Sequence, residues 1–313
     1  MLRTPPILLI ASFLACAGSP VDNPIVGVPR PPGGGVSGGG IGGNGTPNAN
    51  LAFECDRARA EWVWCDDFDR DRLGSYFEVS TAGGAFVRTE GTGRAGSTGM
   101  RVTFRRGTVD AGFLHLALGK TPQSYFRPAD AGTQVYRELW WRAWVHYGPE
   151  WTGGGGVKLM RMFNFASAGS WAQGMIAHVW SGGPGDQHLV LDPASGYSAS
   201  GRLVSTKYND FANLRWLGSV RTSPVFAPGV EGRWLCIETH VRLNTPGQAN
   251  GVFETWIDGR REAGRADLDW GGPWDQYGLN ALYLENYWND GAPGTQTRTF
   301  DNLVVSTAPI GCA

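Results

Sequence analysis

The sequence predicts an all-β fold, a two-sheet antiparallel β-sandwich of the β-jelly-roll type. The first observation is compositional, because 47 glycines, 14 tryptophans and few lysines do not suit a helical bundle. The second is periodic, because short alternating segments bounded by Gly, Pro, Asn or Asp recur from residue 51 onward. Many such strands in about 260 residues favour two packed antiparallel sheets.

The strand signals are short and mostly alternate between apolar and polar residues. They cover 99–107, 137–148, 157–165, 174–182, 233–244, 251–260, 280–288 and 298–307. Helix signals are scarce, with short pieces expected at 54–62 and 209–218. In a jelly roll one sheet curves, and alternate residues of its central strands line a concave face open to solvent.

The N-terminus predicts export. Arg3 precedes a short apolar run at 7–18, which is typical of a signal peptide and too short to span a membrane. We assign 1–16 to this peptide, with Cys16 as a possible lipidated residue and ordinary cleavage as the alternative. Residues 17–50 read as a disordered Gly/Pro-rich linker, and 51–313 as the folded domain. The protein is therefore expected to be extracellular, or anchored to the bacterial cell envelope through a lipid on Cys16 alone.

The net charge and the cysteines limit which partners, disulfides and metals the chain is expected to have. A net charge of −1 argues against nucleic acid. Four cysteines remain in the domain, and their even number predicts two disulfides with three possible connectivities. One of these joins Cys55 to Cys65 and Cys236 to Cys312, while free thiols are the alternative. The lack of CxxC or paired His spacing argues against a zinc site, and we expect a monomer without an organic cofactor.

Polar side chains recur on one face of several strands. In 233–244, Leu235, Ile237, Thr239 and Val241 alternate with Cys236, Glu238, His240 and Arg242. Similar sets occur in other strands and in one loop: Trp140, Arg142, Trp144 and His146; His178 and Trp180; Tyr283, Glu285 and Tyr287; Lys158 with Met160 and Met162, opposite Arg161; and Tyr208, Asn209 and Asp210. Cations and flat aromatic rings suit an acidic sugar chain. A merely solvated polar sheet face is the alternative.

Several blocks resemble a known family. The Asn-Thr-Pro-Gly turn and W-x-D-G hairpin within 233–260 are the most specific, joined by "DDFD" (66–69), "GSTGMRV" (96–102), "GGVKLMR" (155–161) and "FDNLVVS" (300–306). Over about 60–312 the chain resembles the jelly-roll polysaccharide lyases, which are concanavalin A-like sandwiches. They include glucuronan and alginate lyases and a fungal cellulose-induced protein.

The resemblance implies β-elimination on a uronic-acid polysaccharide. "GGVKLMR" is similar to a strand whose lysine lies in the lyase cleft, which points to Lys158, and a polar cleft position falls near His178. A tyrosine usually serves as base and acid, and Tyr208 and Tyr287 are the candidates. We expect Lys158, His178, Tyr208 and His240 to be catalytic. The expected substrate-binding residues are Arg142, Trp144, Trp180, Asn209, Glu238, Glu285 and Tyr287.

A structural Ca²⁺ is also implied by the resemblance. Related jelly rolls hold the ion on the convex side with an acid after the first strand, a loop and an Asp of the last strand. The matching residues are Asp69, Ser97, Gly99 and Asp301. Oxygen ligands of this kind suit Ca²⁺. The alternative is that the two acids only cap strands.

Two other functions compete with the lyase. A non-catalytic carbohydrate-binding protein would need the same groove. A glycoside hydrolase ranks third, because the E-x-D-x-x-E strand motif of retaining sandwich enzymes is missing. Glu254 and Asp258 share one face, but Asp258 falls in a turn.

Overall fold

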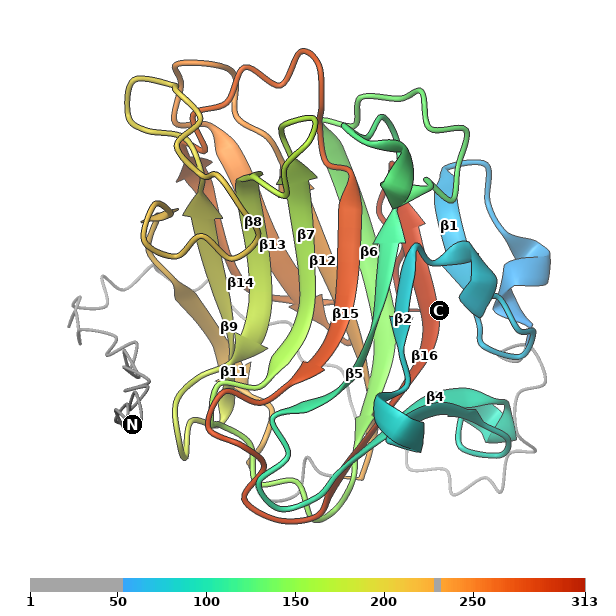
Figure 1. Ribbon diagram of the computed structural model, residues 1–313. Helices are drawn as coiled ribbons and strands as arrows, with labels where there is room; N and C mark the ends of the chain where they lie inside the picture. Colours follow the sequence, from blue (N-terminus) through green and yellow to red (C-terminus); the bar gives the residue numbers. More distant parts are fainter. Residues whose placement is uncertain (1–52, 228–231, 313) are drawn as a thin grey trace, which may run out of the picture. The chain divides into compact units, whose positions relative to one another are not determined.

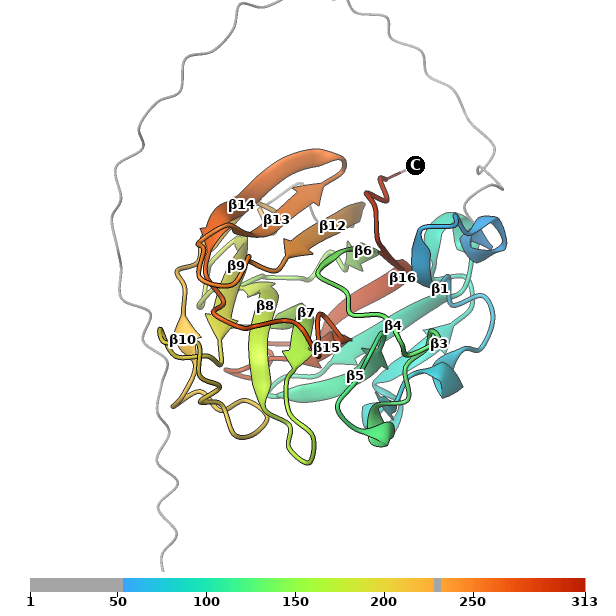
Figure 2. The ribbon, with the colours of Figure 1, turned by 90° about the horizontal axis from the view of Figure 1, so that it is seen from above.

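The computed structural model describes residues 53–227 and 232–312. The predicted signal peptide, the linker and Cys16 lie outside the described residues. Two eight-stranded antiparallel sheets, called sheet A and sheet B here, form the fold. They pack face to face, as Figure 1 and the view from above in Figure 2 show. The predicted β-sandwich is confirmed.

Sheet A contains the strand that carries Glu238 and His240. Its order is β14-β13-β12-β6-β16-β4-β3, and β1 also pairs with β16. Its strands are β1 (Trp62–Asp66), β3 (Phe86–Thr89), β4 (Gly99–Phe104), β6 (Glu138–Tyr147), β12 (Trp234–Arg242), β13 (Gly251–Ile257), β14 (Arg260–Leu268) and β16 (Gln296–Ser306).

Sheet B contains the strands that carry Lys158 and His178. Its order is β10-β9-β8-β7-β15-β5-β2, and β11 also pairs with β9. Its strands are β2 (Glu78–Ser80), β5 (Asp110–Ala117), β7 (Lys158–Phe165), β8 (Gln173–Ser181), β9 (His188–Ser195), β10 (Arg215–Trp216), β11 (Val220–Pro224) and β15 (Ala281–Tyr287). Five short 3-10 turns complete the described elements: η1 (Glu54–Arg57), η2 (Leu73–Ser75), η3 (Ala82–Gly84), η4 (Arg94–Gly96) and η5 (Ser124–Phe126).

The core lies between the sheets and follows the strand alternation. On β12, Leu235, Ile237 and Val241 are buried in it, and the Thr239 hydroxyl is satisfied by Thr255 at 2.8 Å. Because side chains alternate across a strand, the neighbouring residues of β12 point to the outer face of sheet A. The inward face of this strand was predicted correctly.

Two elements differ from the prediction. The segment 209–218 contains β10 instead of a helix, and 54–62 holds only η1 before β1 begins. Strand β5 was not predicted, because Phe113 and Ala117 on one side and Leu114 and Leu116 on the other leave no simple alternation. On one side of β5, Leu114 and Leu116 lie in the core; on the other, Ala117 belongs to a second cluster of aromatic side chains and Phe113 is partly buried.

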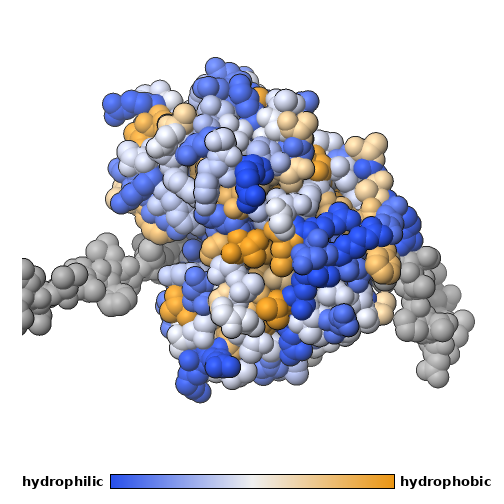
Figure 3. Space-filling view, turned by 45° about the vertical axis from the view of Figure 1, so that its right-hand side comes forward, coloured by the Kyte–Doolittle hydropathy of each residue, from blue (hydrophilic) through white to orange (hydrophobic). Residues whose placement is uncertain are grey.

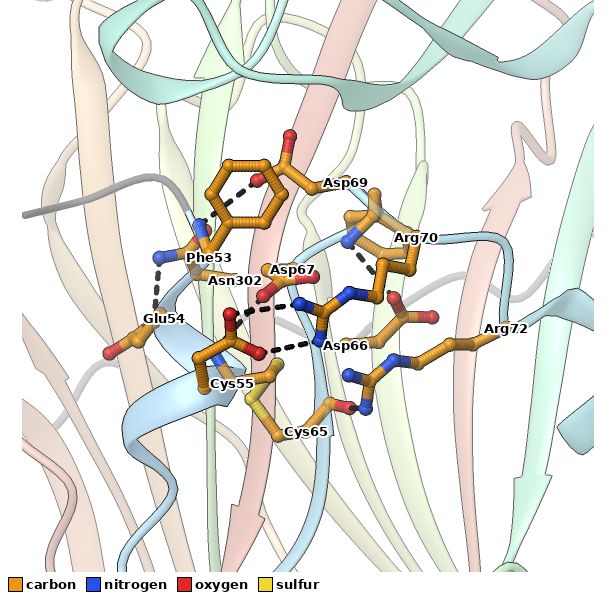
Figure 4. Close-up of a disulfide and its surroundings, with 12 residues drawn as sticks. Phe53, Glu54, Cys55, Cys65, Asp66, Asp67, Asp69, Arg70, Arg72 and Asn302 are labelled. Atoms are coloured by element: carbon orange, nitrogen blue, oxygen red, sulfur yellow. Dashed lines mark hydrogen bonds and ion pairs between the residues drawn. A yellow bond between two sulfur atoms is a disulfide. The ribbon is translucent and has the colours of Figure 1, made fainter. Parts of the chain in front are cut away.

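Both disulfides of the proposed pairing are present. Cys55 is bonded to Cys65, and Cys236 is bonded to Cys312. The first ties η1 to β1, as Figure 4 shows, and the second ties the C-terminal segment to β12. In the described part of the chain, no helix is long and apolar enough to cross a membrane.

Candidate active site on the outer face of sheet B

A row of polar side chains crosses six strands of sheet B. Residues paired directly across antiparallel strands lie on one face with Cβ atoms about 4.5–5.5 Å apart. The pairing register links, from β2 to β9, Glu78, His115, Tyr283, Arg161, His178 and Asp192. The face is the outer one, because Leu114, Leu282, Met160 and Met162 of the same strands lie in the core.

Arg161 is at the centre of this row and is 1% exposed. Its guanidinium binds both carboxylate oxygens of Glu285 and donates to the Tyr208 hydroxyl. It also donates to Asn209 Oδ1 at 3.1 Å. Burial acts to raise the pKa of Glu285, but the charges of Arg161 and Lys158 hold it below its usual value. Arg161 therefore fixes the loop residues Tyr208 and Asn209 over the sheet.

Lys158 lies on the same face through an irregularity in β7. The register shifts between Lys158 and Met160, and Lys158 is paired with Trp180 of β8. This β-bulge overturns the simple alternation, which placed Lys158 with the methionines and Arg161 opposite. Burial, together with the charge of Arg161, lowers the pKa of Lys158 to about 8. Its ammonium lies 4.5 Å from the Tyr287 ring centroid, and no described carboxylate forms a salt bridge with it.

His178 lies directly opposite Arg161 and stacks on Trp180 with ring centroids 4.9 Å apart. Burial, with the charges of Arg161 and Lys158, lowers the pKa of His178 well below its usual value. Its Nε2 atom is buried and has no hydrogen-bond partner among the described residues. The ring is therefore a neutral imidazole with a free nitrogen at neutral pH.

His115 extends the row toward β2. Its ring lies between Phe113 and Tyr283, with centroids at 4.0 and 3.4 Å. Its Nδ1 contacts Glu78 Oε2 at 2.8 Å, whereas its Nε2 and the Tyr283 hydroxyl are buried without partners in the described structure. At the other end, burial raises the pKa of Asp192 to about 6.

The structure brings seven predicted residues together on sheet B. These are Lys158, His178, Tyr208, Trp180, Asn209, Glu285 and Tyr287. It places four others on the outer face of sheet A: Arg142, Trp144, Glu238 and His240. The structure therefore separates Glu238 and His240 of β12 from the predicted residues that gather on sheet B.

On sheet A these four side chains bind other parts of the same chain. Glu238 accepts the N–H groups of Ile310 and Gly311 at 2.7 and 2.9 Å. Arg142 donates to Glu54 at 2.6 Å, and the Arg94 guanidinium lies 3.4 Å from the Trp144 ring centroid.

His240 stacks on Trp140 at 4.1 Å, and its Nε2 contacts Glu138 Oε1 at 2.8 Å. A cavity of about 600 Å³ nearby is lined by Arg137, Glu138 and Arg242, away from the polar row of sheet B.

Sequence reasoning missed Arg161, His115 and Asp192 as site residues and left Tyr283 out of the final set. Arg161 alternates in the sequence with Phe163 and Phe165, and this pattern indicates that the three side chains share one face of the strand. His115 was missed with its strand. Asp192 precedes Pro193, and a proline weakens a strand prediction.

The expected calcium ligands gather beside sheet A. Asp301 Oδ2 accepts from the Ser97 hydroxyl at 2.9 Å and from the Arg94 N–H at 2.6 Å, and Asp69 accepts from the Thr98 N–H at 2.9 Å. Burial raises the pKa of Asp301 to about 7. A Cβ atom on Gly93 would lie 2.7 Å from Asp301 Oδ2, so the loop backbone closes on this carboxylate.

Asp67, which Figure 4 shows with Asp69 near the Cys55–Cys65 disulfide, has an Oδ1 atom that is buried without a partner among the described residues. Within the described residues, no three His, Cys, Asp or Glu side chains form a metal cluster. An ion here would therefore need hydroxyl and carbonyl oxygens as well, which Ca²⁺ accepts. The oxygen atoms of these residues are of the types that Ca²⁺ binds.

Comparison with solved structures agrees with the fold. The PL-14 alginate lyase from Aplysia kurodai matches with a TM-score of 0.55 and 14% identity, covering 80% of this chain and 100% of that chain. The endo-β-1,4-glucuronan lyase from Trichoderma reesei matches at 0.53 and 12%, covering 79% and 96%. The alginate lyase vAL-1 from Chlorella virus matches at 0.53 and 11%, covering 75% and 94%.

The fold is that of the jelly-roll polysaccharide lyases, as the sequence resemblance implied. At these identities the likeness concerns the fold alone. No protein-family model and no curated protein matches the sequence.

Proposed function

We propose that the protein is a polysaccharide lyase that cleaves a uronic-acid polymer by β-elimination on the outer face of sheet B. One observation carries the proposal. A neutral imidazole, a protonated phenol and an ammonium without a carboxylate partner among the described residues converge there around Arg161. These are the groups that elimination beside a carboxylate requires.

The carboxylate of the sugar would bind Lys158. Arg161 is already neutralised by Glu285, so Lys158 supplies the net positive charge of this group. An ammonium beside the substrate carboxylate stabilises the negative charge that develops as the C5 proton leaves. The flat rings of Trp180 and Tyr287 flank this position and suit the apolar faces of sugar rings.

The shifted pKa values assign the acid and the base. The low pKa of His178 keeps the imidazole neutral at pH 7, so that the ring can accept a proton. Burial raises the pKa of Tyr208 well above its usual value, against the lowering effect of Arg161, so the phenol keeps its proton. Two groups whose environments push their pKa values apart are suited to opposite roles.

The elimination consumes no water, because the leaving oxygen takes its proton from a side chain. The C5 proton passes to the His178 imidazole, the electrons of the C5–H bond form the C4=C5 double bond, and the C4–O4 bond breaks. The leaving O4 takes the proton of the Tyr208 hydroxyl. A proton then moves from His178 to Tyr208 through solvent and restores both groups.

A carbohydrate-binding protein without catalysis is the second candidate. It is supported by the saturation of Arg161, whose guanidinium is occupied by Glu285, Tyr208 and Asn209. The hydrolase has less support, since Glu254 pairs with Arg261 and Asp258 accepts the Cys236 N–H, both on sheet A.

We further propose that the protein is exported and acts outside the cytoplasm as a monomer, with Ca²⁺ bound near Asp301. The two disulfides support export, because such bonds persist in oxidising compartments. Figure 3, in which the right-hand side of Figure 1 with β1 and β4 is turned forward, shows apolar patches among hydrophilic areas.

The test is to incubate the protein with a panel of 1,4-linked polyuronides and to follow the ultraviolet absorbance of the unsaturated product. We expect release from at least one polymer, and loss of that signal in Lys158→Ala. Binding to a polyuronide without product would favour the second candidate. No product and no binding across the panel would refute both.

A further inference from the structure

Two aromatic rings lie exposed at the edge of sheet B. Phe211 is 50% exposed and Trp216 is 43% exposed. Their ring centroids are 6.3 Å apart and their planes differ by 19°. Exposing two large apolar rings side by side costs free energy unless a ligand covers them.

The strand register places Trp216 on the same face as the candidate active site. Trp216 of β10 pairs with Ala194 of β9, and Ala194 pairs with Ile176 of β8. Ala194 and Ile176 belong to the aromatic cluster outside the core, on the face of His178. The neighbouring Ser195 instead donates to Trp270 O inside the sandwich, so Trp216 must point outward.

One loop connects the exposed rings to Arg161. Tyr208 and Asn209 contact Arg161, and Phe211 follows two residues later. Asp210 between them accepts from the Thr206 N–H at 2.8 Å and from Asn213 Nδ2 at 3.0 Å, which closes the loop on itself. The Asn209 N–H donates to Gln173 Oε1 at 2.8 Å. The loop therefore presents Phe211 in a fixed position relative to the site.

The spacing fits a polymer that crosses the strands. From β7 to β10 there are three strand-to-strand steps, which together span about 14 Å. Figure 2 shows β10 at one edge of sheet B, beyond β8 and β9. A sugar chain with one residue at Arg161 and Lys158 would reach this edge a few residues further along.

We infer that Phe211 and Trp216 form a remote subsite that stacks against one sugar ring of the same polyuronide chain. This inference rests on the proposed function for the identity of the polymer. The two uncharged rings would stack on the apolar face of one sugar residue, while Lys158 would bind the carboxylate of another. The subsite therefore contributes affinity for long chains and no chemistry.

The experiment compares long and short ligands in Phe211→Ala/Trp216→Ala. Dissociation constants for a long 1,4-linked polyuronide and for its disaccharide are measured by calorimetry in a His178→Gln background, so that the polymer stays intact. Phe53→Ala is the matched control, because Phe53 is 47% exposed and stacks against Arg70 at η1. We expect the double variant to bind the polymer about tenfold or more weakly and the disaccharide unchanged, with the control unaffected.

Equal polymer affinity in the double variant and its parent would overturn the subsite, as would an equal loss for both ligands. A melting temperature within a few degrees of the parent excludes misfolding. The proposed function is tested separately, by measuring product release with the protein that retains His178. Cleavage with unchanged polymer affinity in the double variant refutes only the subsite. Binding that needs Trp216 without cleavage refutes only the lyase. No binding of polyuronide refutes both.

Discussion

The outer faces of sheets A and B carry similar residue types but use them differently. On sheet A, Glu238 is bonded to the N–H groups of residues 310 and 311, and Arg142 to Glu54. On sheet B, His178 Nε2, His115 Nε2 and the Tyr283 hydroxyl are buried without partners among the residues described. Sheet A also has such atoms, among them Arg142 Nε and Trp144 Nε1, so the two faces differ in the segments that cover them and in the charge of Lys158, which no described salt bridge neutralises.

The difference arises from segments far away in the sequence. Each disulfide ties a covering segment to sheet A, one at η1 and one after β16. Over sheet B, the loop at 205–214 binds Arg161, whereas the side chains of Lys158 and His178 are buried but form no salt bridge or hydrogen bond with another described residue. The residue pattern of a strand therefore identifies a polar face, and distant segments decide whether that face is structural or available to a ligand.

The largest expected effect separates the two histidines. His178→Ala should lower the rate of polyuronide cleavage about 10²–10⁴-fold, because it removes the proposed base. His240→Ala should leave the rate within about twofold, since His240 lies on sheet A beside Glu138. Initial rates of product absorbance measure both. A large loss in His240→Ala with normal folding would place the chemistry on the other sheet.

Removing the disulfide that ties the C-terminal segment to sheet A should lower the stability of the protein without changing its function. Cys236→Ala/Cys312→Ala removes a link across 76 residues, which should cost about 4 kcal/mol of unfolding free energy. Polyuronide binding by the folded fraction should be unchanged. Chemical denaturation and calorimetry measure the two quantities. A loss of affinity as large as the loss of stability would mean that sheet A contributes to the ligand site.

Lys158→Met should abolish cleavage yet stabilise the protein. The pKa of Lys158 is about 8 when folded and near 10.5 when unfolded, so burying the charge opposes folding below pH 8. The gain in Lys158→Met should reach roughly 3 kcal/mol at pH 7 and vanish as the pH rises from about 8 to about 10.5. Denaturation at several pH values tests this. A destabilised Lys158→Met at pH 7 would contradict it.

The smallest expected effect concerns the proposed Ca²⁺ on sheet A. Chelation should lower the melting temperature by a few degrees, because an ion that binds only the folded state stabilises it. Polyuronide affinity should change little, since Asp301 lies on the other sheet from His178. An unchanged melting temperature, in protein shown by elemental analysis to have contained calcium, would count against a structural role. Asp301→Asn should abolish the shift.

The sequence was sufficient for the sandwich, for the inward face of β12 and for the disulfide pairing as one of its options. It was not sufficient to assign strands to sheets. His240 and His178 occur in equally alternating segments, and alternation gives the face of a strand but not the sheet that the strand joins. Arg161 was not predicted as a site residue for a different reason. The bulge in β7 interrupts the two-residue alternation from which the faces of Lys158 and Arg161 were assigned.

That bulge also has a consequence for comparing this chain with others. Any alignment that matches β7 residue for residue with a strand that lacks the bulge, without a one-position gap at Leu159, will match Lys158 with an inward-facing position. Deleting Leu159 would remove the bulge and place Lys158 directly before the inward-facing Met160, so regular alternation would still keep the ammonium on the outer face. A single residue without a ladder partner thus decides which position of this strand carries the cation on the outer face.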